Sequence, residues 1–185
     1  MSRLLAISLL LACILLPSLS EGQEISGPEV NIRNGVIHVH FGLNPGQKFI
    51  QGIKAGIDKE LKFYIDLFRI WKIWPDEFIV GRSFTRTLKV DPIKEEYVAT
   101  SLNGNVLIEK RFRSFDSMVS WVVSFKDVKL ASTRDLEPGQ YFVRVTVESR
   151  IRKLPPVIGY FIIFLSENEF KVHKDSGMFT IGGNR

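Results

Sequence analysis

Hydrophobic and polar residues alternate with a period of two along most of the chain, which is typical of half-buried antiparallel strands. The alternation is clearest in YFVRVTVESRI (residues 141–151) and LKFYIDLF (residues 61–68), and FTRTLKV and VLIEKRF repeat it less regularly. The hydrophobic positions in the first two segments are Tyr141, Val143, Val145, Val147 and Ile151, and Leu61, Phe63, Ile65 and Leu67. We expect each set to face the core.

Turn residues separate these segments. Asn34-Gly35 and Asn103-Gly104 each lie between two strand-like runs, and Asn and Gly tolerate the positive φ angles of tight hairpin turns. The segment KDSG, Lys174 to Gly177, predicts a third turn that joins two short final strands.

Two stretches have helical rather than strand periodicity. The first predicts a helix capped by Asn44, with Pro45 at its first position and Gly56 at its end. The second predicts a helix capped by Ser114. Their apolar stripes are Phe49, Ile50, Ile53 and Ile57 in the first, and Phe115, Met118, Val119 and Val122 in the second.

These elements predict a mainly β fold: an antiparallel β-sandwich-like domain with two short helices. The alternative is an α+β fold with both helices on one face of an antiparallel sheet. No repeat or linker divides the chain, so we expect residues 21–185 to form a single exported β-rich domain.

Residues 1–20 have the layout of a secretory signal peptide. Arg3 precedes an uncharged apolar stretch from Leu4 to Leu16, and Pro17 and small serines follow. We expect cleavage after Ser20, or after Gly22, and export to the periplasm. Cys13 lies in LLAC, which resembles a lipoprotein cleavage motif, but apolar residues continue after it. We therefore favour a plain signal peptide over lipidation.

Composition narrows the chemistry of the exported domain. Cys13 is the one cysteine, so the remaining chain can form no internal disulfide and offers no thiolate to a metal or substrate. Loss of Arg3 lowers the net formal charge from +5 to +4, and the basic residues are interspersed with acidic ones. A nucleic-acid-binding stripe is not predicted.

Candidate catalytic groups are few. His38 and His40 are two residues apart and would share a strand face, where they could offer two imidazoles to a metal. The competing interpretation is that Ile37, Val39 and Phe41 face the core and the histidines face water. The acidic pairs Asp76-Glu77 and Glu95-Glu96 fall beside predicted turns, where we expect solvated surface. We predict no enzyme activity and no cofactor.

Aromatic residues give a candidate partner or membrane surface. The segment FRIWKIWPDEF interleaves Phe68, Trp71, Trp74 and Phe78 with basic residues. A strand from Leu61 to Trp71 would carry both tryptophans to one rim of the domain, where they could meet a partner or a membrane interface. The alternative is that the indoles close the end of the core.

A second candidate surface is the uncharged segment from Leu154 to Leu165. As a helix it would be about 18 Å long, too short to span a bilayer core of ~30 Å. Read as a strand it is apolar on both faces, so this domain's own core, a partner or lipid must cover its second face. The residues we assign to this candidate surface are Ile158, Tyr160, Phe161, Ile162 and Phe164.

The order of these features resembles an uncharacterised exported family of Gram-negative bacteria known as domain of unknown function 4390. The resemblance rests on the signal peptide and on LKFYIDLFRIWKIW, RSFTRTLKVDPIKEEYVA, SFDSMVSWV, LEPGQYFVRVTVE and KLPPVIGYF. It implies an envelope domain of no known activity, in which the segment around Arg86, Leu88 and Tyr97 joins two strands and LEPG precedes a strand at Tyr141.

Three functions follow as hypotheses. The first is a non-enzymatic periplasmic module that binds another, unidentified envelope protein. The second is a membrane-surface or lipid-binding module that uses Trp71, Trp74 and the segment from Val157 to Leu165. The third is a metal-dependent enzyme at His38 and His40.

Overall fold

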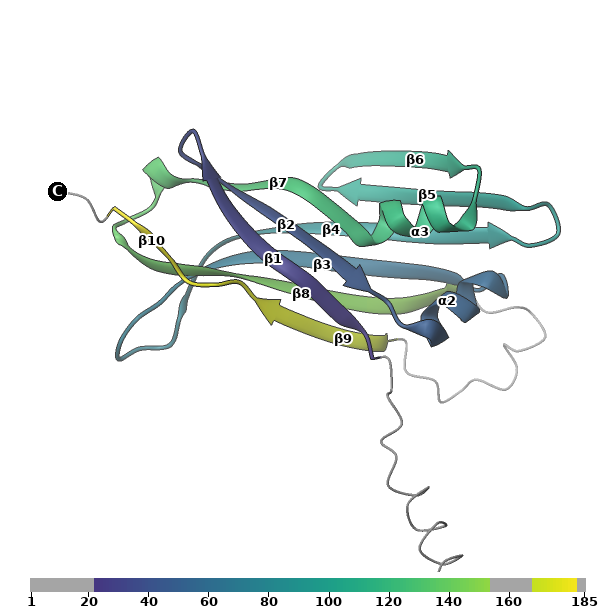
Figure 1. The fold of residues 1–185 in the computed structure, drawn as a ribbon, viewed down its shortest axis with the longest axis horizontal. Coiled ribbons are helices and arrows are strands. Elements are labelled where there is room, and N and C mark those ends of the chain that lie inside the picture. The colour runs from purple at the N-terminus through teal and green to yellow at the C-terminus, as the bar shows by residue number, and fades with distance from the viewer. Residues whose placement is uncertain (1–21, 154–167, 183–185) are drawn as a thin grey trace, which may run out of the picture.

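The computed structural model describes residues 22–153 and 168–182 (Figure 1). The elements in chain order are β1 (Glu24–Arg33), β2 (Val36–Asn44), α2 (Gln47–Lys54), β3 (Asp58–Arg69), β4 (Glu77–Asp91), β5 (Glu96–Asn103), β6 (Val106–Phe112), α3 (Phe115–Val123), β7 (Ser124–Ser132), a short 3₁₀ helix η1 (Thr133–Asp135), β8 (Gly139–Lys153), β9 (Asn168–Asp175) and β10 (Phe179–Ile181). The cleavage site predicted after Ser20 and the segment from Leu154 to Leu165 lie outside the described residues.

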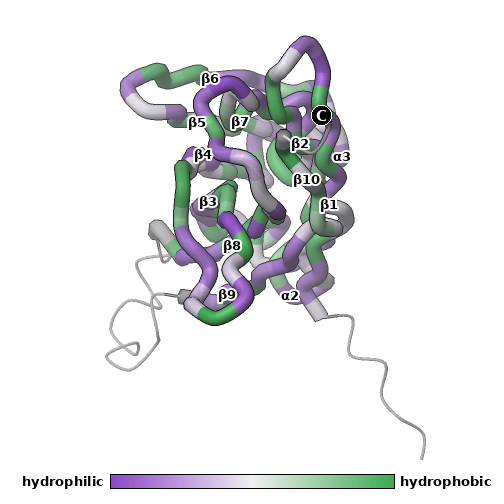
Figure 2. Tube along the Cα trace, turned by 90° about the vertical axis from the view of Figure 1, so that its left-hand side faces the viewer, coloured by the Kyte–Doolittle hydropathy of each residue, from purple (hydrophilic) through white to green (hydrophobic). Residues whose placement is uncertain are grey.

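Two antiparallel sheets form the domain. The smaller sheet has the order β1-β2-β7, and the larger has the order β10-β8-β3-β4-β5-β6, with β9 also paired to β8. Figure 2 views the larger sheet edge-on and shows the smaller sheet and both helices on the same side of it. The β-sandwich-like prediction with two short helices is confirmed, and the helices extend the covering layer beyond the three small strands.

The core lies between the sheets, where the period-two faces meet. The predicted inward positions of β3 and β8 are buried, except that Ile151 is half-buried. Phe125 of β7 is central: its ring centroid lies 4.7 Å from that of Phe41 on β2 and 4.6 Å from that of Phe63 on β3. Such close aromatic packing across the layers holds the two sheets together.

Two of the three predicted turns are present, one of them shifted by a residue. Asn34 and Gly35 have φ angles of 51° and 73° and connect β1 to β2, as expected. In the second hairpin Asn103 pairs with Val106, so the turn residues are Gly104 and Asn105, one position later than predicted. The turn predicted at KDSG is wrong: Lys174 and Asp175 belong to β9, and the chain continues to β10 without reversing, because both strands pair antiparallel with β8.

One predicted helix boundary is confirmed and another is wrong. The Ser114 side chain caps α3 by accepting a hydrogen bond from the Ser117 backbone N–H at 3.3 Å. Helix α2 begins at Gln47 with Gly46 as its N-cap, because Asn44 still belongs to β2 and its side chain instead accepts from the Gly46 N–H. The segment around Arg86, Leu88 and Tyr97 joins β4 to β5 as expected, and the three residues themselves lie within these paired strands.

Two long cationic side chains point into the core. Lys59 forms an ion pair with Glu169, which also accepts a hydrogen bond from the Ser149 hydroxyl at 3.0 Å. Arg86 lies on the inner face of β4, and one guanidinium nitrogen donates to the backbone carbonyls of Trp121, Val122 and Ser124. Buried charges need such partners, and Arg86 obtains its partners from the C-terminal end of α3, where helix carbonyls lack intrahelical donors.

Candidate functional site

Large apolar side chains project from the connection between β3 and β4 and from the start of β4. This apolar tip consists of Trp71, Ile73, Trp74 and Phe78, and all four are exposed, with Ile73 at 90% and Trp74 at 74% of the maximum. Figure 1 places the connection at one end of the larger sheet, beyond the region covered by the smaller sheet. Neighbouring exposed residues of this size and type mark interaction surfaces more often than isolated ones do.

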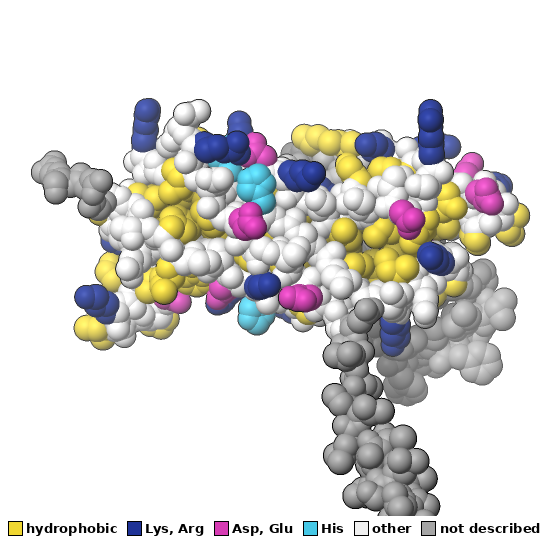
Figure 3. Space-filling model, in the orientation of Figure 1, with side chains coloured by type: hydrophobic (Ala, Val, Ile, Leu, Met, Phe, Trp, Pro, Cys, Tyr) yellow, Lys and Arg dark blue, Asp and Glu magenta, His cyan; other side chains and the backbone are white. Residues whose placement is uncertain are grey.

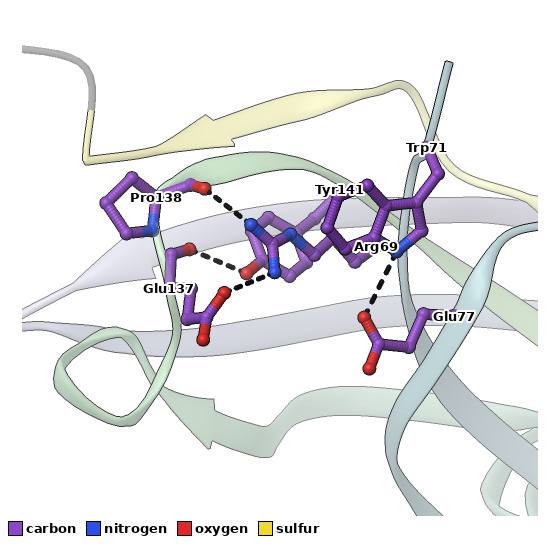
Figure 4. Close-up of polar contacts among 6 residues, drawn as sticks. All are labelled: Arg69, Trp71, Glu77, Glu137, Pro138 and Tyr141. Atoms are coloured by element: carbon purple, nitrogen blue, oxygen red, sulfur yellow. Dashed lines mark hydrogen bonds and ion pairs between the residues drawn. The ribbon is translucent and has the colours of Figure 1, made fainter. Parts of the chain in front are cut away.

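Arg69, the last residue of β3, supports the base of the tip (Figure 4). Its guanidinium donates to the Glu137 carboxylate at 2.5 Å and to the Pro138 carbonyl at 3.0 Å. The same guanidinium lies 4.4 Å from the centroid of the Trp71 ring. Arg69 therefore links the β3–β4 connection to the segment before β8 and positions the first tryptophan by a cation–π contact.

Further hydrogen bonds fix the two ends of the connection. The Trp71 indole N–H donates to Glu77 at 3.1 Å, and the Ile70 backbone N–H donates to the Gln140 carbonyl at 2.8 Å. The buried Tyr141 hydroxyl donates to the Glu137 carbonyl at 2.6 Å, so Glu137 is itself held (Figure 4). Burial is the main reason that the pKa of Tyr141 is raised; Arg69 opposes this, and Glu137 and Glu77 reinforce it.

The structure brings the two predicted tryptophans onto one loop. Strand β3 ends at Arg69, two residues earlier than expected, so both lie beyond the sheet. Trp74 does not close the core, while Trp71 is half-shielded by Arg69. Sequence reasoning missed Ile73, although its position between two tryptophans was a signal. The other predicted surface residues, Ile158, Tyr160, Phe161, Ile162 and Phe164, lie outside the described residues.

Aromatic rings continue from the tip onto the outer face of the larger sheet. Phe68 lies 5.9 Å from Phe78 and 5.3 Å from Phe142, measured between ring centroids, and Arg144 lies 5.3 Å from the Phe68 centroid. Arg144 also forms two hydrogen bonds of 2.7 Å to Asp175. These bonds lower the pKa of Asp175, so the carboxylate stays charged and holds the cation in place.

A groove lies between the sheets near the tip. It has a volume of about 460 Å³ and is lined by residues of β2, β4, β7 and the segment that follows β7. Its apolar lining includes Ile79 and Val80, which directly follow Phe78 of the tip, and Leu136, which directly precedes Glu137. A partner at the tip could therefore extend an apolar side chain toward this groove.

The two histidines of β2 occupy different environments. His38 is buried, contrary to the expectation that both face water, and its Nδ1 lies 2.8 Å from Asp127 without hydrogen-bond geometry. Burial, with help from Arg33, Lys129 and His40, lowers the pKa of His38. His40 is half-buried and accepts a hydrogen bond from the Asp127 N–H at 3.2 Å.

Neither a metal centre nor a spanning helix emerges from residues 22–153 and 168–182. No three His, Cys, Asp or Glu side chains within these ranges gather closely enough to hold a metal ion, so the histidine pair lacks a third ligand there. None of the helices in the same ranges has the length and apolarity needed to cross a bilayer.

The fold and the apolar tip define a β-sandwich-like domain with an exposed, braced apolar loop. The chain belongs to the family described as domain of unknown function (DUF4390), whose sequence profile matches residues 21–176, so the resemblance seen in the sequence is confirmed. No curated protein matches the chain. No solved structure matches it either.

Proposed function

We propose that this protein is a non-enzymatic binding module of the bacterial periplasm that engages another envelope protein through its apolar tip. The main support for this function is that Ile73 and Trp74 project into solvent from a loop whose base is fixed by Arg69 and Glu77. A rigid loop loses little conformational entropy on binding, and tryptophan is enriched among residues that dominate interface energies. The proposed location rests on the signal-peptide layout of residues 1–20.

Crosslinking in the native envelope tests this proposal. A photoreactive amino acid replaces Trp74, and the control replaces Ile93. Ile93 is also apolar and is more exposed than Trp74, but it lies between β4 and β5 at the opposite end of the larger sheet (Figure 1). We expect a discrete protein adduct from position 74 and none from position 93. Equal labelling at both positions, or no protein adduct at position 74, would overturn the proposal.

A membrane surface is the second candidate, because the exposed Lys72 lies between the two tryptophans of the tip. Indole rings favour the interface between lipid and water, and a lysine beside them favours anionic headgroups. Co-sedimentation with vesicles of anionic or of neutral lipid separates this candidate from the first. Binding that requires anionic lipid and is lost in Trp74→Ser would favour the membrane; no sedimentation with either vesicle would remove it.

A further inference from the structure

Among the described strands, β6 forms the outer edge of the larger sheet, and it lies apart from the apolar tip. It ends the order of the larger sheet and, among the strands that the structure describes, pairs only with β5. Figure 1 shows it along the upper border of the molecule, with β5 as its neighbour in the sheet. An exposed edge strand offers unpaired backbone donors and acceptors to another chain, and native proteins usually protect such edges.

The first half of β6 is apolar on both faces. Val106, Leu107 and Ile108 are between 52% and 66% exposed, and Leu102 of β5, directly opposite Leu107, is exposed as well. Consecutive exposed apolar residues on both faces of a strand lower the solubility of a protein. Native edge strands normally carry charged residues at such positions, which prevent association with other chains. The start of β6 is therefore suited to contact with another chain.

The pairing register identifies which backbone groups face outward. Asn103 and Val106 close a two-residue turn, so they form a hydrogen-bonded pair, and such pairs alternate along an antiparallel ladder. The N–H and C=O groups of Leu107, Glu109 and Arg111 consequently point away from β5. An added strand would bind these alternate residues.

A hollow opens beside the second half of β6. Its volume is about 550 Å³, and its lining comes from β6, α3 and β7: Lys110, Phe112, Ser117, Ser120, Trp121, Ser124 and Lys126. The Lys110 ammonium lies over the Phe112 and Trp121 rings, at 5.1 and 5.9 Å from their centroids. None of these lining residues is acidic, so two lysines and three serine hydroxyls offer an anion several donors.

We propose that β6 accepts an extended acidic segment of another protein by strand addition. The apolar residues of the segment would pair along Val106 to Ile108, and its carboxylates would lie against Lys110, Arg111 and the hollow that Lys126 lines. Figure 3 shows hydrophobic side chains followed by Lys and Arg side chains along the upper border, where Figure 1 places β6. This surface is separate from the tip, so the proposal does not depend on the proposed function.

A second copy of this chain fits the edge less well. Strand β6 has seven residues, far fewer than the roughly 20–30 residues per side of a stable interface. Symmetric pairing would also bring Lys110, Arg111 and Arg113 of both copies to one edge, with Glu109 as the acidic residue of each strand. Repulsion between like charges disfavours that assembly, whereas an acidic segment neutralises the same charges.

The test begins with peptides selected from a random library on the protein purified from cells that express the full chain. We expect the selected peptides to combine β-branched residues with Asp or Glu. Amide exchange then locates them: bound peptide should slow the exchange of the Leu107, Glu109 and Arg111 N–H groups, the alternate positions that face outward. Selected peptides without acidic residues, or without protection at these three amides, would overturn the proposal.

Matched variants test the backbone and charge contributions separately. Leu107→Pro removes one outward N–H and should weaken peptide binding about tenfold, while Leu107→Thr keeps that N–H and should weaken it less. Lys110→Glu combined with Lys126→Glu should also cost about tenfold or more. The control Lys89→Glu changes an exposed lysine on the outer face of β4 and should alter affinity little.

The oligomeric state supplies the remaining outcome. If the protein without peptide sediments as a dimer in which the same three amides are already protected, the occupant of β6 is a second copy and the proposal is wrong. If Leu107→Pro does not fold, the doubly reversed lysine variant and the exchange pattern still decide the matter.

Discussion

Two arginine–tryptophan pairs in this domain have the same chemistry and opposite surroundings. Arg69 lies 4.4 Å from the Trp71 ring at the exposed end of the larger sheet, and Arg86 lies 4.8 Å from the Trp121 ring in the interior. Arg69 has a carboxylate partner in Glu137, whereas Arg86 bonds to three backbone carbonyls and lies 3.6 Å from the Phe125 ring. Burial lowers the pKa of Arg86 to about 10.

The two arginines therefore have different roles: Arg86 stabilises the fold, and Arg69 positions an exposed surface. One guanidinium nitrogen of Arg86 donates to the end of α3 and thereby joins the helix to β4, so the loss of Arg86 would disturb the core. Arg69 braces a loop whose outermost residues, Ile73 and Trp74, are largely exposed. The same type of pair therefore supports stability in one place and positions an apolar surface in the other.

The largest expected effect comes from Arg86→Ala. The substitution leaves the carbonyls of Trp121, Val122 and Ser124 without their buried donor and opens a cavity, so the free energy of unfolding should fall by about 3 kcal/mol. Urea unfolding measures it. Arg86→Lys keeps the charge and should cost less, and a loss below 1 kcal/mol for Arg86→Ala would show that the pair is not structural.

A smaller effect is expected from Tyr141→Phe, beneath the tip. The variant loses the hydrogen bond to the Glu137 carbonyl and should unfold with about 1 kcal/mol less free energy. Because the folded-state pKa of Tyr141 is raised, the unfolded tyrosine ionises first as pH rises through about 10. The stability advantage of wild type over the variant should therefore be complete below that pH and shrink above it. An advantage that grows there would contradict the buried assignment.

The smallest effect on folding is expected from Ile73→Ser. This side chain is 90% exposed, so its replacement should change the free energy of unfolding by less than about 0.5 kcal/mol. Thermal unfolding of the variant beside wild type measures it. A loss of 2 kcal/mol would mean that Ile73 packs against the domain and does not belong to a binding surface.

Period-two patterning predicted most of the fold. The inward faces of β3 and β8, the Asn34-Gly35 turn and the Ser114 cap were all correct because each depends on local residue chemistry. The start of α2 was wrong because pairing of β2 extends through Asn44, and a tertiary contact overrode a favourable cap. Local sequence patterns do not predict which strands pair when those strands are far apart in the sequence.

The candidate sites were only partly predictable for the same reason. Arg86 lies two residues from both Phe84 and Leu88, so the alternation held a signal for the inner face that the sequence analysis did not use, and its carbonyl partners come from a distant helix. The pattern of β6 indicated a strand, yet its position at a sheet edge depends on the whole strand order. The sequence predicted that the two tryptophans of the tip lie at one rim of the domain. It did not predict the contacts of Glu137 and Tyr141 beneath the tip, because these residues are remote from it in sequence.

The central claim is that the outermost residues of the tip contact a partner and contribute little to folding. The most direct test is the yield of the protein adduct from the photoreactive group at position 74, measured in the native envelope with Ile73 intact and with Ile73→Ser. The account predicts that the yield falls severalfold in the serine variant while its unfolding free energy is unchanged. An equal yield in both proteins would contradict the claim.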